Sequence, residues 1–380
     1  MLNKSVVQNL TPLFIGGLIG IGFLYYLSVV INVDLNLEEL ALGEENTASY
    51  SSIDENKIHC GDLTDAQQCI DNYYGNAVGN EVVLWLGNSQ LHTINQMEDG
   101  DELSSSILHK AAKKQDQYFL TFSQPNSSLQ EHYLLFEYLL QNLPISYLIL
   151  PVVFDDLRET GIRGGLIKAL ENEEVIKRLS KRNVGKILIS NQGDKDAAGN
   201  DMGALAQTTQ EVTEKQLNSY LEDIWGIWKQ RPEFRGHLMG SLYLLRNWIF
   251  GITPSSTRRM IPGRYSLNMQ AMKAILHSAN EQGIKVLVYI VPLRDDVKIP
   301  YDLDQYDKFK SEVELSSKSN YEIRYVNFEK IVPANLWGSK ASTTIGGGEE
   351  LDFMHFKAGG HKILADGILS ELVLLWSKEE

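Results

Sequence analysis

The sequence predicts an α/β protein built as a three-layer sandwich around a mainly parallel sheet, and three observations lead to that prediction. Continuous apolar runs recur along the chain, amphipathic helical segments lie between them, and glycine or polar turn residues separate the two. An apolar run without alternation is typical of a strand buried on both faces, as in a parallel sheet covered by helices. The chain has 380 residues, 43% of them hydrophobic, which is enough for one large core or one core with an insertion.

Five apolar runs are expected to form the sheet and three amphipathic segments to form helices. The expected strands are 82–86, 118–122, 147–153, 286–291 and a weaker run at 325–328. The expected helices are 129–142, 267–282 and 362–376. The second of these ends at Gly283, a residue type that favours helix termination. Strands alternating with helices indicate a parallel sheet with helices on both faces.

The alternation is interrupted at about residues 164–250, which are mostly helical in pattern and charged. We expect a helical insertion on the side of the carboxyl ends of the strands, where ligands of open α/β sheets bind. Two roles stay open for it, a lid or substrate-recognition element and a stabilising helical appendage. Residues 186–189 fit a short strand or part of a helix equally well.

The first 33 residues are expected to form a cytoplasmic tip and a transmembrane anchor. No charged side chain occurs between Lys4 and Asp34, and the apolar run at 12–33 is long enough to cross a bilayer as a helix. A cleaved signal peptide is the alternative, but the run exceeds a usual signal-peptide core and no clear cleavage site follows it. Lys4 before the run favours a cytoplasmic N-terminus, with the rest of this single-pass protein in a periplasm or at the cell surface.

Residues 34–79 are polar and acidic at first and are expected to form a stalk, so that the main domain spans 80–380. Cys60 and Cys69 lie in this stretch, and in an oxidising compartment they would close a small loop as a structural disulfide, with two free thiols as the alternative. The net charge is −14 and no basic stripe is interleaved with aromatic residues, which argues against nucleic-acid binding. No spacing typical of metal ligands occurs, and we expect no metal or organic cofactor.

Two short motifs carry the chemistry. Gly87-Asn88-Ser89-Gln90 directly follows the first expected strand, and Asp352-Phe353-Met354-His355 precedes the last helix. A serine between a strand and a helix projects from the carboxyl end of the sheet, with its amide placed to stabilise an oxyanion; an N-cap is the alternative. An aspartate three residues before a histidine can orient the imidazole. Together the motifs predict the nucleophile, base and orienting acid of a serine hydrolase or acyltransferase.

These two motifs resemble the first and last sequence blocks of the SGNH/GDSL hydrolase superfamily. The resemblance covers about residues 80–376 and implies an SGNH-like sandwich with Ser89 as nucleophile, His355 as base and Asp352 as its partner. With its expected anchor the chain most resembles the membrane-anchored, extracytoplasmic members. These include the D-alanyl transfer protein of teichoic-acid modification and alginate-acetylation proteins, which work beside membrane O-acyltransferases.

The middle blocks of the superfamily, which usually supply a glycine amide and an asparagine side chain to the oxyanion hole, are not matched. The candidates for the hole are Ser89 and Asn126, and Asn126 fits a turn residue after proline equally well. Arg158 and Arg163 are candidates for binding an anionic polymer, with ion pairs to neighbouring acids as the alternative. His92 is expected on a helix surface, with a position facing the pocket as the alternative.

Arg258, Arg259 and Arg264 are expected either to form a basic patch that attracts a charged polymer or to tie down their own loop. The function expected from all of this is that of a membrane-anchored serine O-acyltransferase or esterase. It would act through an acyl-serine on an extracytoplasmic polysaccharide or cell-envelope polymer, beside a polytopic membrane O-acyltransferase. The alternative is a catalytically degenerate SGNH domain that binds polysaccharide or scaffolds such an enzyme.

Overall fold

The computed structural model of the chain describes residues 46–113, 116–193, 249–251, 256–318, 322–340 and 350–376. All of these except 249–251 belong to one compact unit. The expected anchor at 12–33 and most of the expected insertion, residues 194–248, lie outside the described residues. Within the described ranges, no helix combines the length and apolar character that a membrane span needs.

A six-stranded sheet, parallel throughout, forms the middle of the domain in the order β10-β9-β8-β5-β7-β4. Its strands are β4 (His59–Cys60), β5 (Glu81–Gly87), β7 (Gln117–Ser123), β8 (Ile145–Val152), β9 (Lys285–Ile290) and β10 (Ile323–Asn327). The five expected strands are therefore confirmed. Residues 82–86 of β5 are buried on both faces, as their continuous apolar run predicts.

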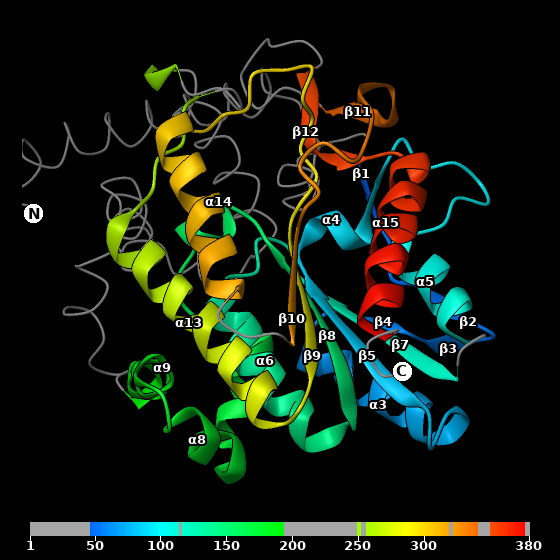
Figure 1. Cartoon of the computed structure of the whole chain (residues 1–380), viewed down its shortest axis with the longest axis vertical. Helices are drawn as coiled ribbons and strands as arrows, with labels where there is room; N and C mark the ends of the chain where they lie inside the picture. The colour runs from blue at the N-terminus through cyan, green and yellow to red at the C-terminus, as the bar shows by residue number, and fades with distance from the viewer. Residues whose placement is uncertain are drawn as a thin grey trace, which may run out of the picture. The chain divides into compact units, whose positions relative to one another are not determined.

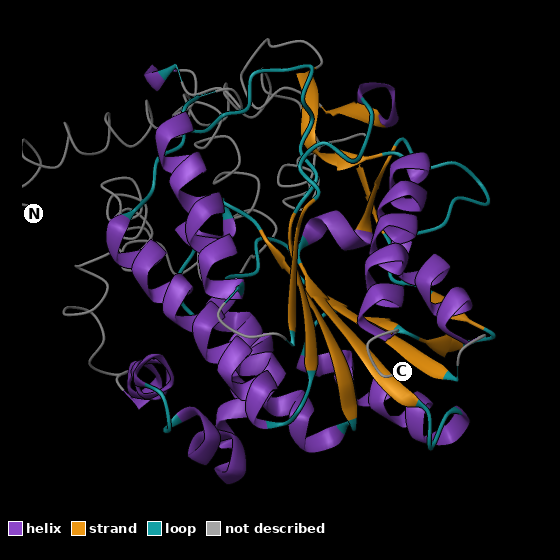
Figure 2. Cartoon of the chain, in the orientation of Figure 1, coloured by secondary structure: helices purple, strands orange, loops and turns teal. Residues whose placement is uncertain are grey.

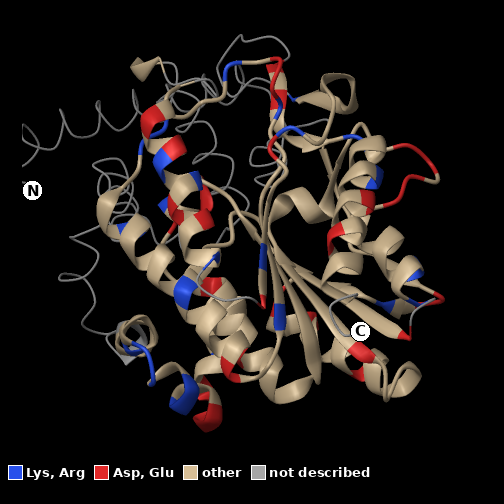
Figure 3. Cartoon of the chain, viewed as in Figure 1, with Lys and Arg blue, Asp and Glu red and all other residues tan. Residues whose placement is uncertain are grey.

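Helices cover both faces of this sheet, which confirms the α/β class (Figures 1 and 2). On one side α6 (Leu129–Asn142) contacts α13 (Pro262–Glu281), and α14 (Leu303–Ser317) contacts β10. On the other side α15 (Ala358–Trp376) contacts α5 (Ser104–Ala112), which in turn contacts β7. Charged residues belong mainly to the helices and loops, and the strands contain few of them (Figure 3).

The described start of the insertion is helical. It consists of α7 (Gly164–Ile167), the short 3-10 helix η3 (Lys168–Glu171), α8 (Glu173–Leu179) and α9 (Asn183–Gly193). Residues 186–189 thus lie in a helix. In this part of the chain α8 contacts α6 and α9 contacts α13, and Arg178 of α8 forms an ion pair with the buried Glu137 of α6. These contacts extend the helical layer on that face of the sheet.

The expected stalk is wrong from residue 46 onward, because residues 46–76 are part of the folded domain. β1 (Asn46–Ala48) pairs with β6 (Thr93–Asn95), β2 (Ser52–Ile53) pairs with β3 (Asn56–Lys57), and β4 adds an edge to the main sheet beside β7. α3 (Leu63–Asn76) then leads back to β5. These strands are only two or three residues long, too short to show a hydrophobic period in the sequence.

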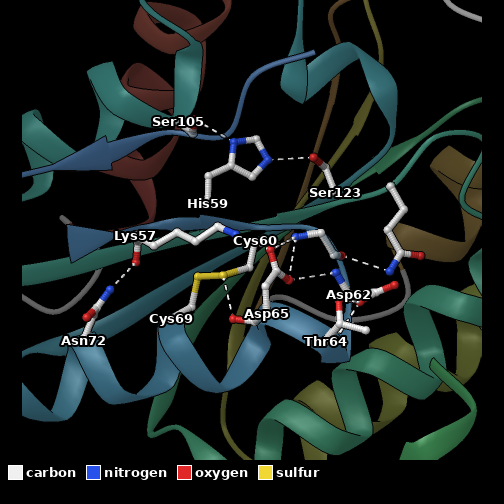
Figure 4. The surroundings of a disulfide bond; sticks show 12 residues. Lys57, His59, Cys60, Asp62, Thr64, Asp65, Cys69, Asn72, Ser105 and Ser123 are labelled. Carbon is white, nitrogen blue, oxygen red and sulfur yellow. Dashed lines mark hydrogen bonds and ion pairs between the residues drawn. A yellow bond between two sulfur atoms is a disulfide. The ribbon is translucent and has the colours of Figure 1, made fainter. Parts of the chain in front are cut away.

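A disulfide joins Cys60 of β4 to Cys69 of α3, as one of the two alternatives predicted. Figure 4 shows the disulfide on one side of β4 and the ring of His59 on the other, as the alternation of side chains along a strand requires. A chain cross-linked across a sequence separation of nine residues gains roughly 2.5 kcal/mol by the loop-entropy relation. The bond fastens the edge strand to the helix that covers it.

Candidate active site

Ser89 lies at the topological switch point of the sheet, where the connections that leave two neighbouring strands run in opposite directions. β5 has β7 on one side and β8 on the other. The chain leaves β5 for α5 on one face and leaves β8 for the helices of the opposite face (Figure 1). The crevice outside the carboxyl ends of two such strands is where ligands of open α/β sheets bind. The nucleophile candidate therefore stands at the expected place for a site.

The turn before Ser89 is held by its own side chains. Asn88 caps the single-turn helix α4 (Ser89–His92), and its Oδ1 accepts a hydrogen bond of 3.0 Å from the Gln90 amide. A Cβ on Gly87 would lie 2.1 Å from Cδ1 and 2.7 Å from Cγ of the buried Leu91, so a larger residue at this position would force that leucine to move. Because α4 has only one turn, it contributes little dipole to an oxyanion.

Asp352 and His355 lie on a bulge of β12 (Glu350–Phe356). β12 pairs with β11 (Trp337–Lys340), where Trp337 faces Phe356 and Ser339 faces Leu351, so that residues 352–355 all lie opposite Gly338. Bulges redirect side chains and are frequent beside active sites. Within this bulge Oδ1 of Asp352 accepts the amides of Met354 at 2.8 Å and His355 at 3.1 Å. The extra residues turn the aspartate back toward the histidine.

The structure brings Ser89, His355 and Asp352 together in one hydrogen-bonded chain. Nε2 of His355 lies 3.0 Å from Oγ of Ser89, and Nδ1 of His355 lies 2.9 Å from Oδ2 of Asp352. A proton on Nδ1 satisfies the carboxylate and leaves Nε2 to accept the serine hydroxyl. Ser89 and His355 are each 7% exposed, while Asp352 is 1% exposed. The spacing and burial fit a nucleophile, a base and an orienting acid.

Asp352 is held by more than the histidine. Nδ2 of Asn46 donates to Oδ2 of Asp352 at 2.9 Å, and Asn46 is itself fixed by a 3.0 Å bond from Asn95. Burial disfavours the charged carboxylate, but the adjacent His355 and the hydrogen bonds outweigh it and hold the pKa of Asp352 below its ordinary value. The acid is therefore ionised at neutral pH. Asn46 was missed in the sequence because it fell in the expected stalk.

Gln90 joins the two halves of the site. Its Nε2 donates to the carbonyl of Pro292, beyond β9, at 3.0 Å and to the carbonyl of Met354 at 2.8 Å. One buried side chain thus connects the turn that carries Ser89 to the bulge that carries His355. The sequence offered no means of assigning this role, since both acceptors are backbone groups far away in the chain.

Replacing Gln90 by leucine is expected to slow the reaction of Ser89 with a serine-reactive fluorophosphonate about 10- to 100-fold, because a small displacement of the base from the nucleophile has that effect. The rate of labelling measures this. Gln67→Leu, on the exposed face of α3, is the matched control and should react like the wild type. An unchanged labelling rate in folded Gln90→Leu protein would contradict the proposed role of Gln90 in holding the base near the nucleophile.

Asn126 is an exposed turn residue with a left-handed backbone, φ 49°. Among the described residues, no hydrogen bond connects its side chain to Ser89 or His355. Asn126 therefore has the position of a turn residue after proline, which was the alternative to a contact in the oxyanion hole. Arg163 places its guanidinium on the carboxylate of Glu131, with bonds of 2.8 and 2.9 Å. Arg158 contacts Asp155 at 3.3 Å, so both arginines make the ion pairs predicted as their alternative role.

The three arginines of the expected basic patch make separate contacts. Arg258 binds Asp155 and places its guanidinium carbon 5.2 Å from the ring centre of Phe353. Arg259 is exposed and lies 3.6 Å from the carboxylate of Asp302. Arg264 is buried and donates to the carbonyl of Arg158 at 2.8 Å. These contacts connect α13 and the segment before it to the loop after β8, to Phe353 and to Asp302.

The expected surface position of His92 is wrong, since this side chain is 0% exposed. Its Nδ1 lies 2.7 Å from Oγ of Ser123, which also lies 2.6 Å from Nε2 of His59. His59 reaches Ser105 on its other side (Figure 4), and the ring of Tyr50 stacks on His92. Burial lowers the pKa of His92 to about 3. The two histidines and two serines of this second group are each at most 1% exposed, so the group is closed to solvent.

Among the described residues, no cluster of histidine, cysteine, aspartate or glutamate is arranged to hold a metal ion. Comparison of the sequence with protein-family models found no match, and comparison with curated proteins found none either. The assignment of a function therefore depends on the geometry of Ser89, His355 and Asp352 and on the sequence motifs that contain them.

Proposed function

We propose that this protein is a serine acyl-ester enzyme of the SGNH type, an O-acyltransferase or esterase of the cell envelope. The observation that supports this is the hydrogen-bonded chain from Ser89 through His355 to the buried Asp352. A parallel sheet with the serine after a central strand and the acid and base just before the last helix is consistent with that superfamily.

The chemistry would run in two halves. Oγ of Ser89 attacks the ester carbonyl while Nε2 of His355 takes its proton, and the ionised Asp352 stabilises the resulting imidazolium. The tetrahedral intermediate then collapses, the departing alkoxide takes the proton from His355, and an acyl-serine remains. Water or a sugar hydroxyl next gives its proton to His355 and attacks the acyl group. The product acid or ester leaves, and Ser89 regains its proton.

The substrate proposed is an extracytoplasmic polysaccharide or cell-envelope polymer. The disulfide between Cys60 and Cys69 supports an oxidising compartment, because such bonds rarely persist in the cytosol. The apolar run at residues 12–33 supports an anchor in the membrane beneath that compartment. A polytopic membrane O-acyltransferase would be the partner that supplies acyl groups, in which case a sugar hydroxyl rather than water resolves the acyl-serine.

A second candidate is a degenerate domain that binds polysaccharide or scaffolds an acyltransferase without turnover. Two donors near the turn of Ser89 favour it, because both are already engaged. The amide of Gln124 donates to the carbonyl of Gly87 at 3.2 Å, and the side chain of Asn88 donates to Asp156 at 2.9 Å. Removing one donor from an oxyanion hole typically lowers kcat about 10²- to 10³-fold.

Labelling with a fluorophosphonate distinguishes the two candidates. Wild-type protein is expected to form a covalent adduct, and peptide mass spectrometry should place it on Ser89. Ser89→Ala should lose the adduct, whereas Ser311→Ala, an exposed serine of α14, should keep it. Folded wild-type protein that forms no adduct at Ser89 would contradict the enzymatic proposal and favour the scaffold.

A further inference from the structure

Asp156 begins the short 3-10 helix η2 (Asp156–Arg158) just beyond β8, and its carboxyl group is directed to the turn that carries Ser89. Nδ2 of Asn88 donates to Oδ2 of Asp156 at 2.9 Å. The opposite end of the same amide accepts the backbone N–H of Gln90. The side chain of Asn88 is thus fixed at both ends, and Asp156 provides the only anchor outside its own turn among the described contacts.

The surroundings of Asp156 offer it no positive charge. It is 5% exposed, and no lysine or arginine of the described residues forms an ion pair with it. The cations nearby are engaged elsewhere, since Arg158 and Arg258 bind Asp155, Arg163 binds Glu131 and Arg264 donates to the carbonyl of Arg158. The charged groups that influence its carboxyl are acids, namely Asp155 and Glu159 beside it and Glu131 of α6.

A buried carboxyl without a cation is more stable with its proton than without it. Burial raises the pKa of Asp156 well above its ordinary value; the hydrogen bond from Asn88 offsets this in part, and the neighbouring acids add to the rise. An uncharged carboxyl still accepts the Asn88 bond through its carbonyl oxygen. It also avoids placing a negative charge beside the oxyanion that would form at Ser89.

We propose that Asp156 works as an uncharged carboxylic acid that holds Asn88, and through it the turn of Ser89, in the position needed for attack. This makes Asp156 a positioning residue, and the inference rests on the proposed ester chemistry. The role requires that the side chain at 156 accepts a hydrogen bond and that it carries no charge. Substitutions can separate these two features. Asparagine keeps the size and the carbonyl acceptor and cannot carry a charge, whereas leucine keeps the branching of the side chain, is larger, and removes the acceptor.

The first arm of the test measures turnover of p-nitrophenyl acetate. Asp156→Asn is expected to keep kcat within about threefold of the wild type at pH 7. Asp156→Leu should lower kcat about 10- to 100-fold with little change in KM, because the serine is misplaced and the ester site is not. In the wild type kcat should decline at alkaline pH as the acid ionises, and Asp156→Asn should not share that decline.

The second arm measures Tm by thermal unfolding at pH 5 and pH 8. The native state holds the Asp156 proton more tightly than the unfolded state, so the wild type loses stability as pH rises from the unfolded pKa toward the native one. Asp156→Asn removes that loss. Its Tm relative to the wild type should therefore rise from pH 5 to pH 8, while Asp71→Asn, an exposed residue of α3, should show no such trend.

If Asp156→Asn loses as much kcat as Asp156→Leu, a charged carboxylate is required and the inference is wrong. It is equally wrong if folded Asp156→Leu turns over ester like the wild type. Failure of the proposed function gives a different pattern, since the wild type itself would then neither hydrolyse the ester nor react with a fluorophosphonate. The Tm comparison would still report whether Asp156 carries a charge.

Discussion

Replacing Asp352 by asparagine is expected to lower kcat for p-nitrophenyl acetate about 10⁴-fold while leaving the protein folded. Each carboxylate oxygen of Asp352 accepts two N–H groups, Oδ1 from the amides of Met354 and His355 and Oδ2 from Asn46 and the His355 ring. An amide offers only one oxygen, so its NH₂ group would face donors. The imidazole would then carry its proton on Nε2, where it cannot accept the proton of Ser89.

The measurement is steady-state turnover combined with circular dichroism to verify folding. Asp366→Asn is the matched control, because this exposed aspartate of α15 pairs only with Lys362 among the described contacts and lies outside the hydrogen-bonded chain. The control should turn over ester like the wild type. A folded Asp352→Asn protein within tenfold of wild-type kcat would show that the aspartate does not orient the base.

Acidification from pH 7 to pH 5 is expected to lower the free energy of unfolding by several kcal/mol. Burial lowers the pKa of His92 to about 3 and those of His132 and His361 to about 4. The unfolded chain takes up these protons near pH 6.5, so their contribution to stability is complete above that pH and is lost as the pH falls. At pH 5 each of the three contributes a loss of about 2 kcal/mol.

A combined loss of about 6 kcal/mol is comparable with the whole stability of an ordinary domain. His59 and His109 act in the same direction, since burial also lowers their pKa values. Asp156 acts in the opposite direction, because its raised pKa favours the native state as pH falls, but it is one group against five. Urea unfolding at pH 7, 6 and 5 measures the sum.

The exposed His277 of α13 provides the control for this experiment. His277→Gln should unfold with the same dependence on pH as the wild type. A free energy of unfolding that stays flat between pH 7 and pH 5 would mean that the buried imidazoles are not neutral in the native state, which would contradict their lowered pKa values.

The sheet could be predicted in large part because its central strands are buried on both faces. Such strands must be apolar at every position, so β5, β7, β8 and β9 appear as continuous runs in the sequence. Helix α6 could be predicted as well, since its apolar positions lie between Ser128 and Asn142 and the capping pair of Ser128 and Glu131 begins it. β4 could not be predicted, because a two-residue strand carries no period.

The candidate site, like the fold, could be predicted from the sequence only in part. The proposed nucleophile, base and acid lie in two four-residue motifs whose local spacing already suggests this chemistry. The contribution of Asn46 could not be foreseen, because it depends on β1 pairing with β6 beside the bulge of β12. The burial of His92 likewise depends on Tyr50 and on the edge strand that carries His59. Each of these roles requires partners that are remote in sequence.

The sequence by itself determined the class of the fold and singled out the three side chains of the proposed catalytic group, because both follow from patterns within a few residues. Only the tertiary structure decided how those side chains meet. Gln90 binds the carbonyls of Pro292 and Met354, and the bulge opposite Gly338 turns Asp352 toward His355. Backbone acceptors and strand register cannot be recognised from the type of any one residue. Their effect on the site can therefore be seen only in the folded chain.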